Sequence, residues 1–280
     1  MAGPVNPAVV ACLACPYCAA DLVPAPGALR CPAGHSFDLA RQGYVTLLPR
    51  GARGPAGDTA GMVAARDRFL AAGHYAPLTR LLAEEAAGAA EGAVLDVGAG
   101  TGHHLAAVLD AAAGRVGVAL DASRYAARRA ARAHPRAGAV VADAWRGVPV
   151  RTAAAGLVLD VFAPRNGPEI ARVLAPGGQL LVVTPAADHL AELVGALGLL
   201  TVDERKDERL AGSLEPHLVP VDRTEHRWPL SLPVAAAVAA AAMGPSAHHL
   251  DPAELADRAA ALPDPAPTTA AVVLTRYRAG

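Results

Sequence analysis

A glycine-rich turn that directly follows a short apolar run constrains the fold of this chain more than any other feature. The run contains one acid, Asp96, and leads into Gly98, Gly100 and Gly102 ahead of a stretch with helical spacing. Glycine adopts positive φ without strain and lets a ligand approach the backbone closely. The N-terminus of the following helix would present unpaired N–H groups. The segment therefore predicts a strand, a ligand-binding turn and a helix, in that order.

Short apolar runs alternate with helical stretches through the middle of the chain. We expect strands over Ala93–Val97, Val116–Leu120, Ala139–Val141, Gly156–Phe162 and Leu180–Thr184. The helices expected between them are Leu105–Ala112, Tyr125–Ala133 and Pro168–Leu174. This alternation is typical of a parallel sheet with right-handed crossovers. Nearer the C-terminus we expect two helices and a closing antiparallel pair, over His189–Leu199, Pro252–Leu262, His226–Leu232 and Thr269–Tyr277.

Three acids stand at the ends of successive expected strands: Asp96, Asp121 and Asp143. Carboxylates in these positions could accept hydrogen bonds from ribose hydroxyls and from an adenine amine. A dinucleotide site prefers the order G-x-G-x-x-G. This loop instead reads D-x-G-x-G-x-G, which resembles the loop of class I methyltransferases. The alternatives are that each acid only caps a helix or turn, or that the loop binds a nicotinamide or another nucleotide.

We therefore predict an α/β fold built on a class I (Rossmann-like) methyltransferase sheet, with S-adenosylmethionine as the cofactor. The cofactor-binding residues predicted from this part of the sequence are Asp96, Gly98, Gly100, Thr101, Gly102, Asp121 and Asp143.

The N-terminal part of the chain holds a second motif with the spacing C-x2-C-x12-C-x3-H. Its residues are Cys15, Cys18, Cys31 and His35. Three thiolates and one imidazole at this spacing can close a tetrahedral zinc site, and a site with four protein ligands is structural rather than catalytic. Disulfides are the alternative, but no secretion signal precedes the motif, which favours free thiols. Cys12 is left over as a small apolar residue.

These features divide the chain into three segments. Residues 1–49 would form a zinc-binding module that recognises RNA, and residues 50–90 a linker followed by two helices that lead into the sheet. Residues 91–280 would form the S-adenosylmethionine-binding domain. The linker begins with a Gly/Pro/Arg stretch, and the helical pattern that follows is interrupted at Gly73–Tyr75.

The net charge of −1 means that any contact with RNA must come from a local patch. Candidates for phosphate contacts and one stacking surface follow the zinc motif: Arg41, Tyr44, Arg50 and Arg53. A second candidate is the arginine run after the second strand, which includes i,i+4 spacing: Arg124, Arg128, Arg129, Arg132 and Arg136. In both cases the alternative is a solvated surface.

The chain resembles bacterial 23S rRNA guanine-N1 methyltransferases, particularly the actinobacterial tylosin-resistance type of macrolide producers. Besides the zinc motif, the resemblance rests on Phe37–Asp38, Gly43–Val45, Gly73–Tyr75, Phe162–Pro164, Pro176–Gly178, Thr184–Pro185 and His189–Leu190. It implies zinc on the four motif residues and cofactor contacts at Tyr75, Gly100–Thr101 and His189. It also implies a guanine substrate in a hairpin that lines the peptide exit tunnel, at position 748 in the resistance type, where methylation weakens macrolide binding.

Guanine N1 carries a proton at neutral pH, so the reaction requires a proton acceptor. Asp160, at the end of an expected strand, is the candidate base, and solvent is the alternative. Phe162 is the candidate wall of the target-base pocket, because aromatic faces hold flipped bases. Core packing is the alternative role for Phe162.

Two other functions are compatible with these motifs. The chain could methylate a small metabolite, with zinc only supporting the fold, or it could be a non-catalytic ribosome-binding protein. No apolar stretch reaches the length of a membrane span, so we expect a cytoplasmic protein with no membrane partner. A homodimer is compatible with the sequence.

Overall fold

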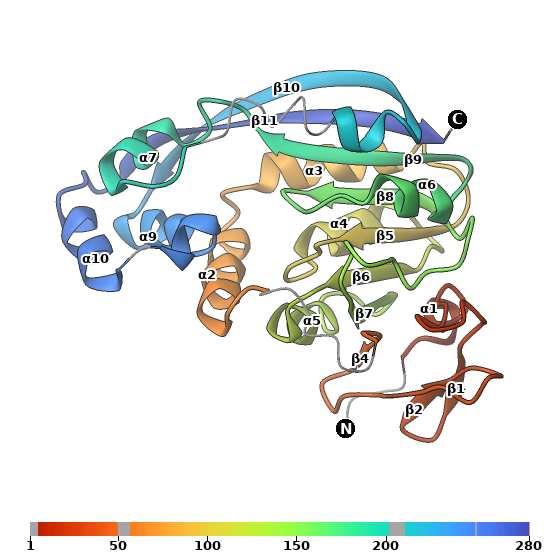
Figure 1. Ribbon diagram of the computed structural model, residues 1–280. Coiled ribbons are helices and arrows are strands. Elements are labelled where there is room, and N and C mark those ends of the chain that lie inside the picture. Colours follow the sequence, from red (N-terminus) through yellow and green to blue (C-terminus); the bar gives the residue numbers. More distant parts are fainter. Residues whose placement is uncertain (1–4, 50–56, 202–210, 250, 280) are drawn as a thin grey trace.

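An eight-stranded sheet dominates the computed structural model, which describes residues 5–49, 57–201, 211–249 and 251–279. The strand order is β10-β11-β9-β8-β5-β6-β7-β4, and helices cover both faces (Figure 1). In that order the strands are Leu218–Leu232, Ala266–Ala279, Leu174–Pro185, Ala155–Val161, Ala93–Val97, Gly117–Asp121, Ala137–Val141 and Tyr44–Thr46.

The central strands run parallel, as the sequence predicts, and the described strands of this sheet form two antiparallel pairs, β9–β11 and β11–β10. From β5 the chain moves outward through β6 to β7 and then returns to place β8 on the other side of β5. Such a switch in strand order opens a crevice at the carboxyl ends of the strands, where α/β sheets bind ligands. The predicted α/β class is confirmed.

Strand residues alternate between two hydrophobic cores, one on each face of the sheet. In β5, Val94 packs into one core, while Leu95 and Val97 pack into the other. The first core is covered by α2 (Ala60–Ala71), α3 (Ala76–Ala86), α4 (His103–Ala111) and helices from the C-terminal part. The second is covered by α1 (Pro7–Val10) and α6 (Gly167–Val173). Burial on both faces explains why these strands read as continuous apolar runs.

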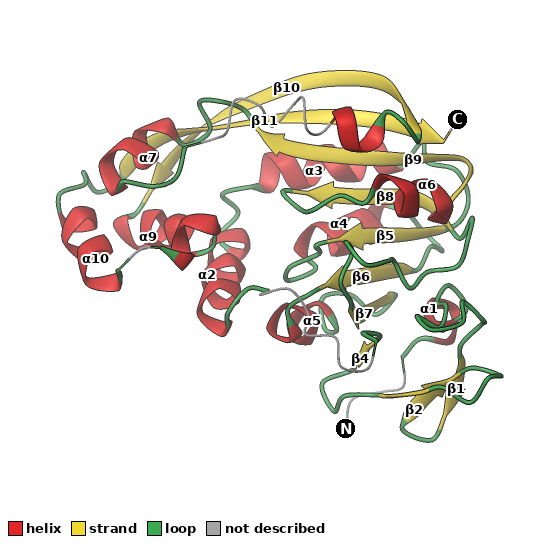
Figure 2. Cartoon of the chain, viewed as in Figure 1, coloured by secondary structure: helices red, strands yellow, loops and turns green. Residues whose placement is uncertain are grey.

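α5 (Arg124–Ala130) also packs on the first core. Four further elements follow in the C-terminal part: α7 (Ala191–Leu197), α9 (Val234–Ala242), the 3-10 helix η1 (Pro245–His248) and α10 (Pro252–Ala260). β10 and β11 extend past the other strands as a long pair toward α7 (Figure 2). Within the described ranges, no helix combines the length and the hydropathy that a bilayer crossing needs.

The N-terminal residues form a small three-stranded sheet of β1 (Val23–Ala25), β2 (Ala28–Arg30) and β3 (Ser36–Asp38). The chain then places β4 alongside β7 as a parallel edge strand. Tyr44–Thr46, expected within the zinc module, therefore belong to the main sheet. Leu13, Leu29 and Phe37 of the N-terminal part share the second core with the sheet strands.

Three C-terminal elements differ from the expectations. The helix expected over His189–Leu199 spans only Ala191–Leu197, because Leu190 and Gly198 at its two ends both have positive φ. β10 begins at Leu218 rather than near His226; its first half is largely exposed and carries no apolar alternation. α9, an alanine-rich segment, was not among the expected elements.

Candidate functional site

The glycine-rich turn connects β5 to α4 and has the conformation that its sequence predicts. Gly98, Gly100 and Gly102 all have positive φ, between 55° and 76°. At Gly98 a side chain would also be excluded by space, because a Cβ there would lie 2.5 Å from the Cβ of Ala163. The turn is thus pressed against the segment that follows β8 and presents its backbone to the crevice.

Asp121, at the end of β6, is bonded to this turn. Its carboxylate accepts hydrogen bonds from the backbone N–H of Gly100 at 2.9 Å and of Ser123 at 2.7 Å. Burial raises the pKa of Asp121, and these two N–H donors oppose that rise. The carboxylate therefore keeps acceptor capacity beside the loop, as a ribose-binding residue requires.

Asp96 and Asp143 flank Asp121 on the neighbouring strands. Asp96 in β5 is buried, and this burial, together with the charges of Asp121 and Asp160, raises its pKa well above the ordinary value. Asp143 follows β7 and accepts a hydrogen bond from the N–H of Trp145 at 3.0 Å. The Trp145 side chain is 62% exposed next to this acid. The three predicted acids therefore lie at one edge of the sheet.

Tyr75, His189 and Phe162 come together from three distant parts of the chain. The hydroxyl of Tyr75 lies 2.9 Å from Nε2 of His189. The Phe162 ring centroid lies 5.8 Å from that of His189 and 6.4 Å from that of Tyr75. Tyr75 is buried, which raises the pKa of its phenol and keeps it protonated. Because Phe162 is 40% exposed, the cluster has one aromatic face open to solvent.

Phe162 has an unusual backbone for an aromatic residue. Its φ is +56°, a left-handed conformation that costs a non-glycine residue on the order of 1 kcal/mol or more. The N–H of Phe162 donates to the carbonyl of Val183 at 3.0 Å, which fixes this turn at the end of β8. Such strain, held next to the cofactor loop, is typical of functional sites.

Asp160 lies beside this turn but has no exposed surface. Its carboxylate forms an ion pair with Arg165, whose Nε lies 3.2 Å away. A buried and paired carboxylate is poorly placed to take a proton from a substrate. Its surroundings favour a role in holding the end of β8 over the predicted role of proton acceptor.

The Cys and His residues of the N-terminal motif gather in one place. Their ligand atoms all lie within 4.8 Å of one another. Nδ1 of His35 lies 3.3 to 3.6 Å from the three Sγ atoms, and the Sγ atoms of Cys18 and Cys31 lie 3.7 Å apart. A tetrahedral zinc ion with the usual bond lengths requires separations of about 3.5 to 3.8 Å. The four residues therefore fit a zinc ion, and Cys12 lies outside the group.

The predicted RNA-contacting residues are placed only in part. Arg41 is exposed and Tyr44 is half-buried against the first core. Arg50 and Arg53 lie outside the described residues. In the arginine run, Arg136 turns inward and donates to the carbonyls of Ala112 and Arg115, which excludes it from an RNA surface.

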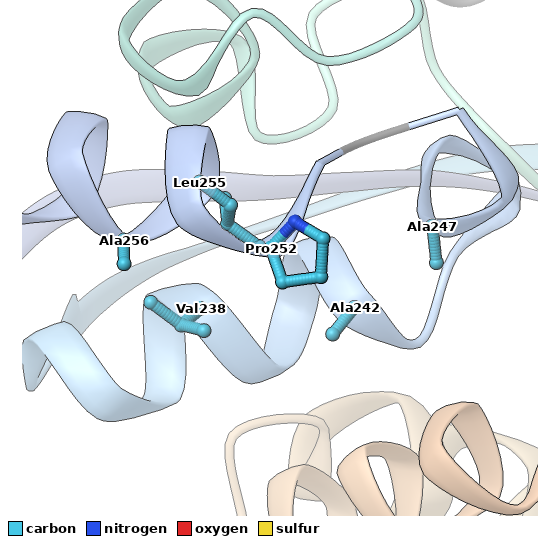
Figure 3. Close-up of a pocket in the computed structure, with 6 residues that line it drawn as sticks. All are labelled: Val238, Ala242, Ala247, Pro252, Leu255 and Ala256. Carbon is cyan, nitrogen blue, oxygen red and sulfur yellow. The ribbon is translucent and has the colours of Figure 1, made fainter.

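The described residues line two cavities of about 280 Å³ each. One is apolar and lies between α9, η1 and α10, lined by Val238, Ala242, Ala247, Pro252, Leu255 and Ala256 (Figure 3). Without a polar side chain in its lining, it does not suit a charged cofactor. The other is polar and borders the glycine loop, lined by Asp67, Ala71, Thr101, His103, Ala106, Arg129, Arg132 and Ala133.

Comparison with known proteins identifies the family. The 23S rRNA (guanine(748)-N(1))-methyltransferase of Streptomyces fradiae is 54% identical over 274 residues, which cover 96% of this chain and 98% of that protein. The chain is a member of the 23S rRNA (guanine-N1)-methyltransferase family. A second relative, from Micromonospora griseorubida, is also 54% identical, over 98% of this chain and 99% of its own length, and is provisionally assigned to the same family.

Two further comparisons agree with this membership. A family model described as "RlmA, N-terminal", a zinc ribbon, matches residues 13–53 of the methyltransferase. The crystal structure of the YcgJ protein from Bacillus subtilis superposes with a TM-score of 0.50 at 16% identity, over 72% of this chain and 97% of that protein, which supports the fold. The chain is thus an S-adenosylmethionine-dependent methyltransferase with a zinc-binding module, and the resemblance inferred from its sequence is confirmed.

Some residues of the site carry no recognisable signal in the sequence. Tyr75 and His189 are 114 residues apart and were singled out only by the family resemblance. Arg66 of α2 was not singled out, although it lies against Gly100. The helical spacing of the apolar residues predicted this helix. That spacing does not indicate that Arg66 would lie against the glycine-rich loop.

Proposed function

We propose that this methyltransferase transfers a methyl group to N1 of the guanine at position 748 of 23S rRNA. The observation that carries the proposal is 54% identity over nearly the full length to the Streptomyces fradiae enzyme, which is named for that reaction. Ribosomal RNA is cytoplasmic in bacteria, so the proposed substrate implies a cytoplasmic enzyme.

The carboxyl edge of the sheet supports binding of S-adenosylmethionine, which supplies an electrophilic methyl group. Asp121 and Asp143 would accept hydrogen bonds from the ribose and the adenine amine, and the backbone of Gly98–Gly102 would line the ligand. Asp96, whose pKa is raised by burial, lies in the strand that leads into this loop. Tyr75 and His189, linked by their hydrogen bond, would line the site where the methyl group is presented.

Phe162 supports placement of the target base next to these two residues. Its exposed ring and strained backbone put an aromatic face at the mouth of the Tyr75–His189 pair. A guanine extruded from its hairpin could stack on this ring. Stacking would orient its N1 toward the methyl group of the cofactor, and this orientation would supply most of the rate enhancement. The Asp160–Arg165 pair would hold the end of β8 in place, and solvent would accept the N1 proton.

The zinc module and the adjacent edge of the sheet support RNA binding. Zinc held by Cys15, Cys18, Cys31 and His35 would fix the three short strands, with Arg41 exposed beyond them. On α5, the guanidinium of Arg124 lies 5.0 Å from the centroid of the Tyr125 ring and Arg128 is exposed, as is Arg132 just after the helix. Arginine interleaved with an exposed aromatic ring suits phosphates and unpaired bases. Arg50 and Arg53 would extend this surface from the linker.

Methyl incorporation into RNA tests the proposal directly. The purified enzyme, labelled S-adenosylmethionine and 23S rRNA fragments that contain the position-748 hairpin should give N1-methylguanine at that position, mapped by primer extension and nucleoside mass spectrometry. Methylation at another guanine would reject the position, and the absence of any RNA product would favour a small-metabolite substrate. Expression in a susceptible bacterium should then raise resistance to tylosin-type macrolides, because N1 methylation weakens their binding.

A further inference from the structure

Arg66 lies over the glycine-rich loop and has no part in the site described so far. A Cβ built on Gly100 would lie 3.3 Å from both Cδ and Nη1 of Arg66. Burial raises the pKa of Asp121, and the positive charge of Arg66 is among the effects that oppose that rise. The guanidinium is therefore close to both the turn and the ribose-binding acid.

The guanidinium is held in this position from two sides. Its Nη1 forms an ion pair with Asp58, and its Nη2 donates to the carbonyl of Met243 at 2.7 Å. Its side chain is 25% exposed. An arginine has five N–H donors. Within the described part of the chain, these contacts use two of them, which leaves donors for a ligand on the loop.

The order of the acids along the sheet orients the cofactor relative to Arg66. Asp143 at β7 suits the adenine and Asp121 at β6 suits the ribose, so the amino-acid end of the ligand points toward β5 and its loop. That end carries a carboxylate, which needs a cation or several N–H donors. Arg66 lies against Gly100 of this loop.

We propose that Arg66 binds the α-carboxylate of S-adenosylmethionine and forms the amino-acid end of the cofactor site. Asp58 and Met243 pre-position the guanidinium, so that little side-chain freedom is lost when the ligand binds. The proposal rests on the proposed function only through its cofactor, because it requires no particular RNA substrate.

Calorimetric binding of two ligands tests this assignment without RNA. S-adenosylhomocysteine carries the carboxylate, whereas 5′-methylthioadenosine has the same nucleoside without the amino-acid part. Arg66→Gln should weaken S-adenosylhomocysteine binding by about 10- to 100-fold, the usual loss for hydrogen bonds to a charged group, and leave 5′-methylthioadenosine binding within about twofold. Arg68→Gln, an exposed arginine on the same helix, should change neither affinity.

An equal loss of affinity for both ligands would overturn the proposal and assign Arg66 to the fold of the loop. If Arg66→Gln lowers thermal stability, Arg66→Lys gives a second test because it keeps the positive charge on this side chain. Arg66→Lys should bind S-adenosylhomocysteine more tightly than Arg66→Gln does, and equal affinity in the two variants would contradict the proposal. The wild type could fail to methylate RNA while Arg66→Gln still loses affinity for S-adenosylhomocysteine alone. That result would reject the proposed RNA substrate and leave the role of Arg66 unchanged.

Discussion

The zinc module and the main sheet are stabilised in different ways. The strands β1, β2 and β3 are three residues long and expose much of their surface, including Val23. In contrast, β5 is buried along its whole length and packs on both faces. Three short strands bury little apolar surface among themselves, so the module depends on a metal cross-link in addition to the contacts that Leu13, Leu29 and Phe37 make with the second core. The zinc module is thus held by metal and by its contact with the sheet, whereas the central strands are held by burial.

Removing a zinc ligand should produce the largest difference in effect between the zinc module and the main sheet. Structural zinc contributes on the order of 10 kcal/mol to the folding of small modules. Cys31→Ser should therefore release the metal and disorder the module, and RNA methylation should fall on the order of 100-fold as phosphate contacts are lost. S-adenosylhomocysteine affinity should change by less than about threefold, because the cofactor site belongs to the sheet.

Metal analysis, calorimetry and methyl incorporation would measure these three effects. Cys12→Ser is the matched control, because Cys12 lies outside the metal cluster and its thiol donates to the carbonyl of Ala8. Full RNA affinity in metal-free Cys31→Ser would show that the sheet domain recognises RNA by itself. A large loss of cofactor affinity would show that the module supports the sheet as well.

A substitution in the cofactor site should weaken cofactor binding and leave the zinc module intact. In Asp121→Asn, the amide group cannot accept both N–H bonds that the carboxylate now takes from Gly100 and Ser123. Loss of a charged acceptor at a buried site should weaken S-adenosylhomocysteine binding by about 10- to 100-fold. Zinc content should stay at one ion per chain.

Asp110→Asn provides the control for this change, because Asp110 is an exposed aspartate that pairs only with His134. Its ligand affinity should match that of the wild type. Unchanged affinity in Asp121→Asn would remove Asp121 from the cofactor site.

The sequence predicted those parts of the sheet domain whose functional residues lie together in one segment with a recognisable local pattern. β5, its acid and its glycines form one continuous segment, and the positive φ values explain each glycine. The four metal-binding residues are likewise recognisable because their spacing along the chain is itself the geometric requirement.

Other parts of the site depend on contacts that no local pattern encodes. His189 meets Tyr75 only after β9 and β11 have paired, since Nδ1 of His189 lies 2.8 Å from the carbonyl of Ala271 in β11. The strain at Phe162 arises from its bond to Val183 on the neighbouring strand. β4, three residues long, is too short for a periodic signal, and its pairing with β7 decides its place.

The half-buried His104 should make the sheet domain sensitive to acid. Burial, helped by the charges of His103 and Arg66, lowers the pKa of His104 to about 3, and its Nδ1 lies 3.1 Å from the hydroxyl of Thr79. Above pH 6.5 both the folded and unfolded states carry a neutral imidazole. Below that pH the unfolded chain binds a proton that the folded chain excludes, so stability falls by about 1.4 kcal/mol per pH unit until about pH 3.

His104→Asn should remove about 2 kcal/mol of the stability lost between pH 7 and pH 5. Denaturant unfolding followed by tryptophan fluorescence would measure it, because Trp145 and Trp228 both report on the sheet domain. His249→Asn, at an exposed site, should keep the wild-type pH dependence. Equal pH dependence in His104→Asn and the wild type would show that acid acts through another region, such as the zinc module.

The smallest expected effect concerns the proposed RNA contacts of Arg128 and Arg132. Arg128→Gln combined with Arg132→Gln should weaken hairpin binding several-fold at low salt and reduce the salt slope of the affinity by about 1 to 2 units, because each lost phosphate contact removes about one. Arg80→Gln with Arg278→Gln removes the same charge from exposed positions on α3 and β11 and should leave the slope unchanged. If both pairs of substitutions reduce the salt slope equally, RNA affinity depends only on the overall charge of the protein. A loss confined to Arg128 and Arg132 would support an RNA surface that reaches from the zinc module onto the sheet domain.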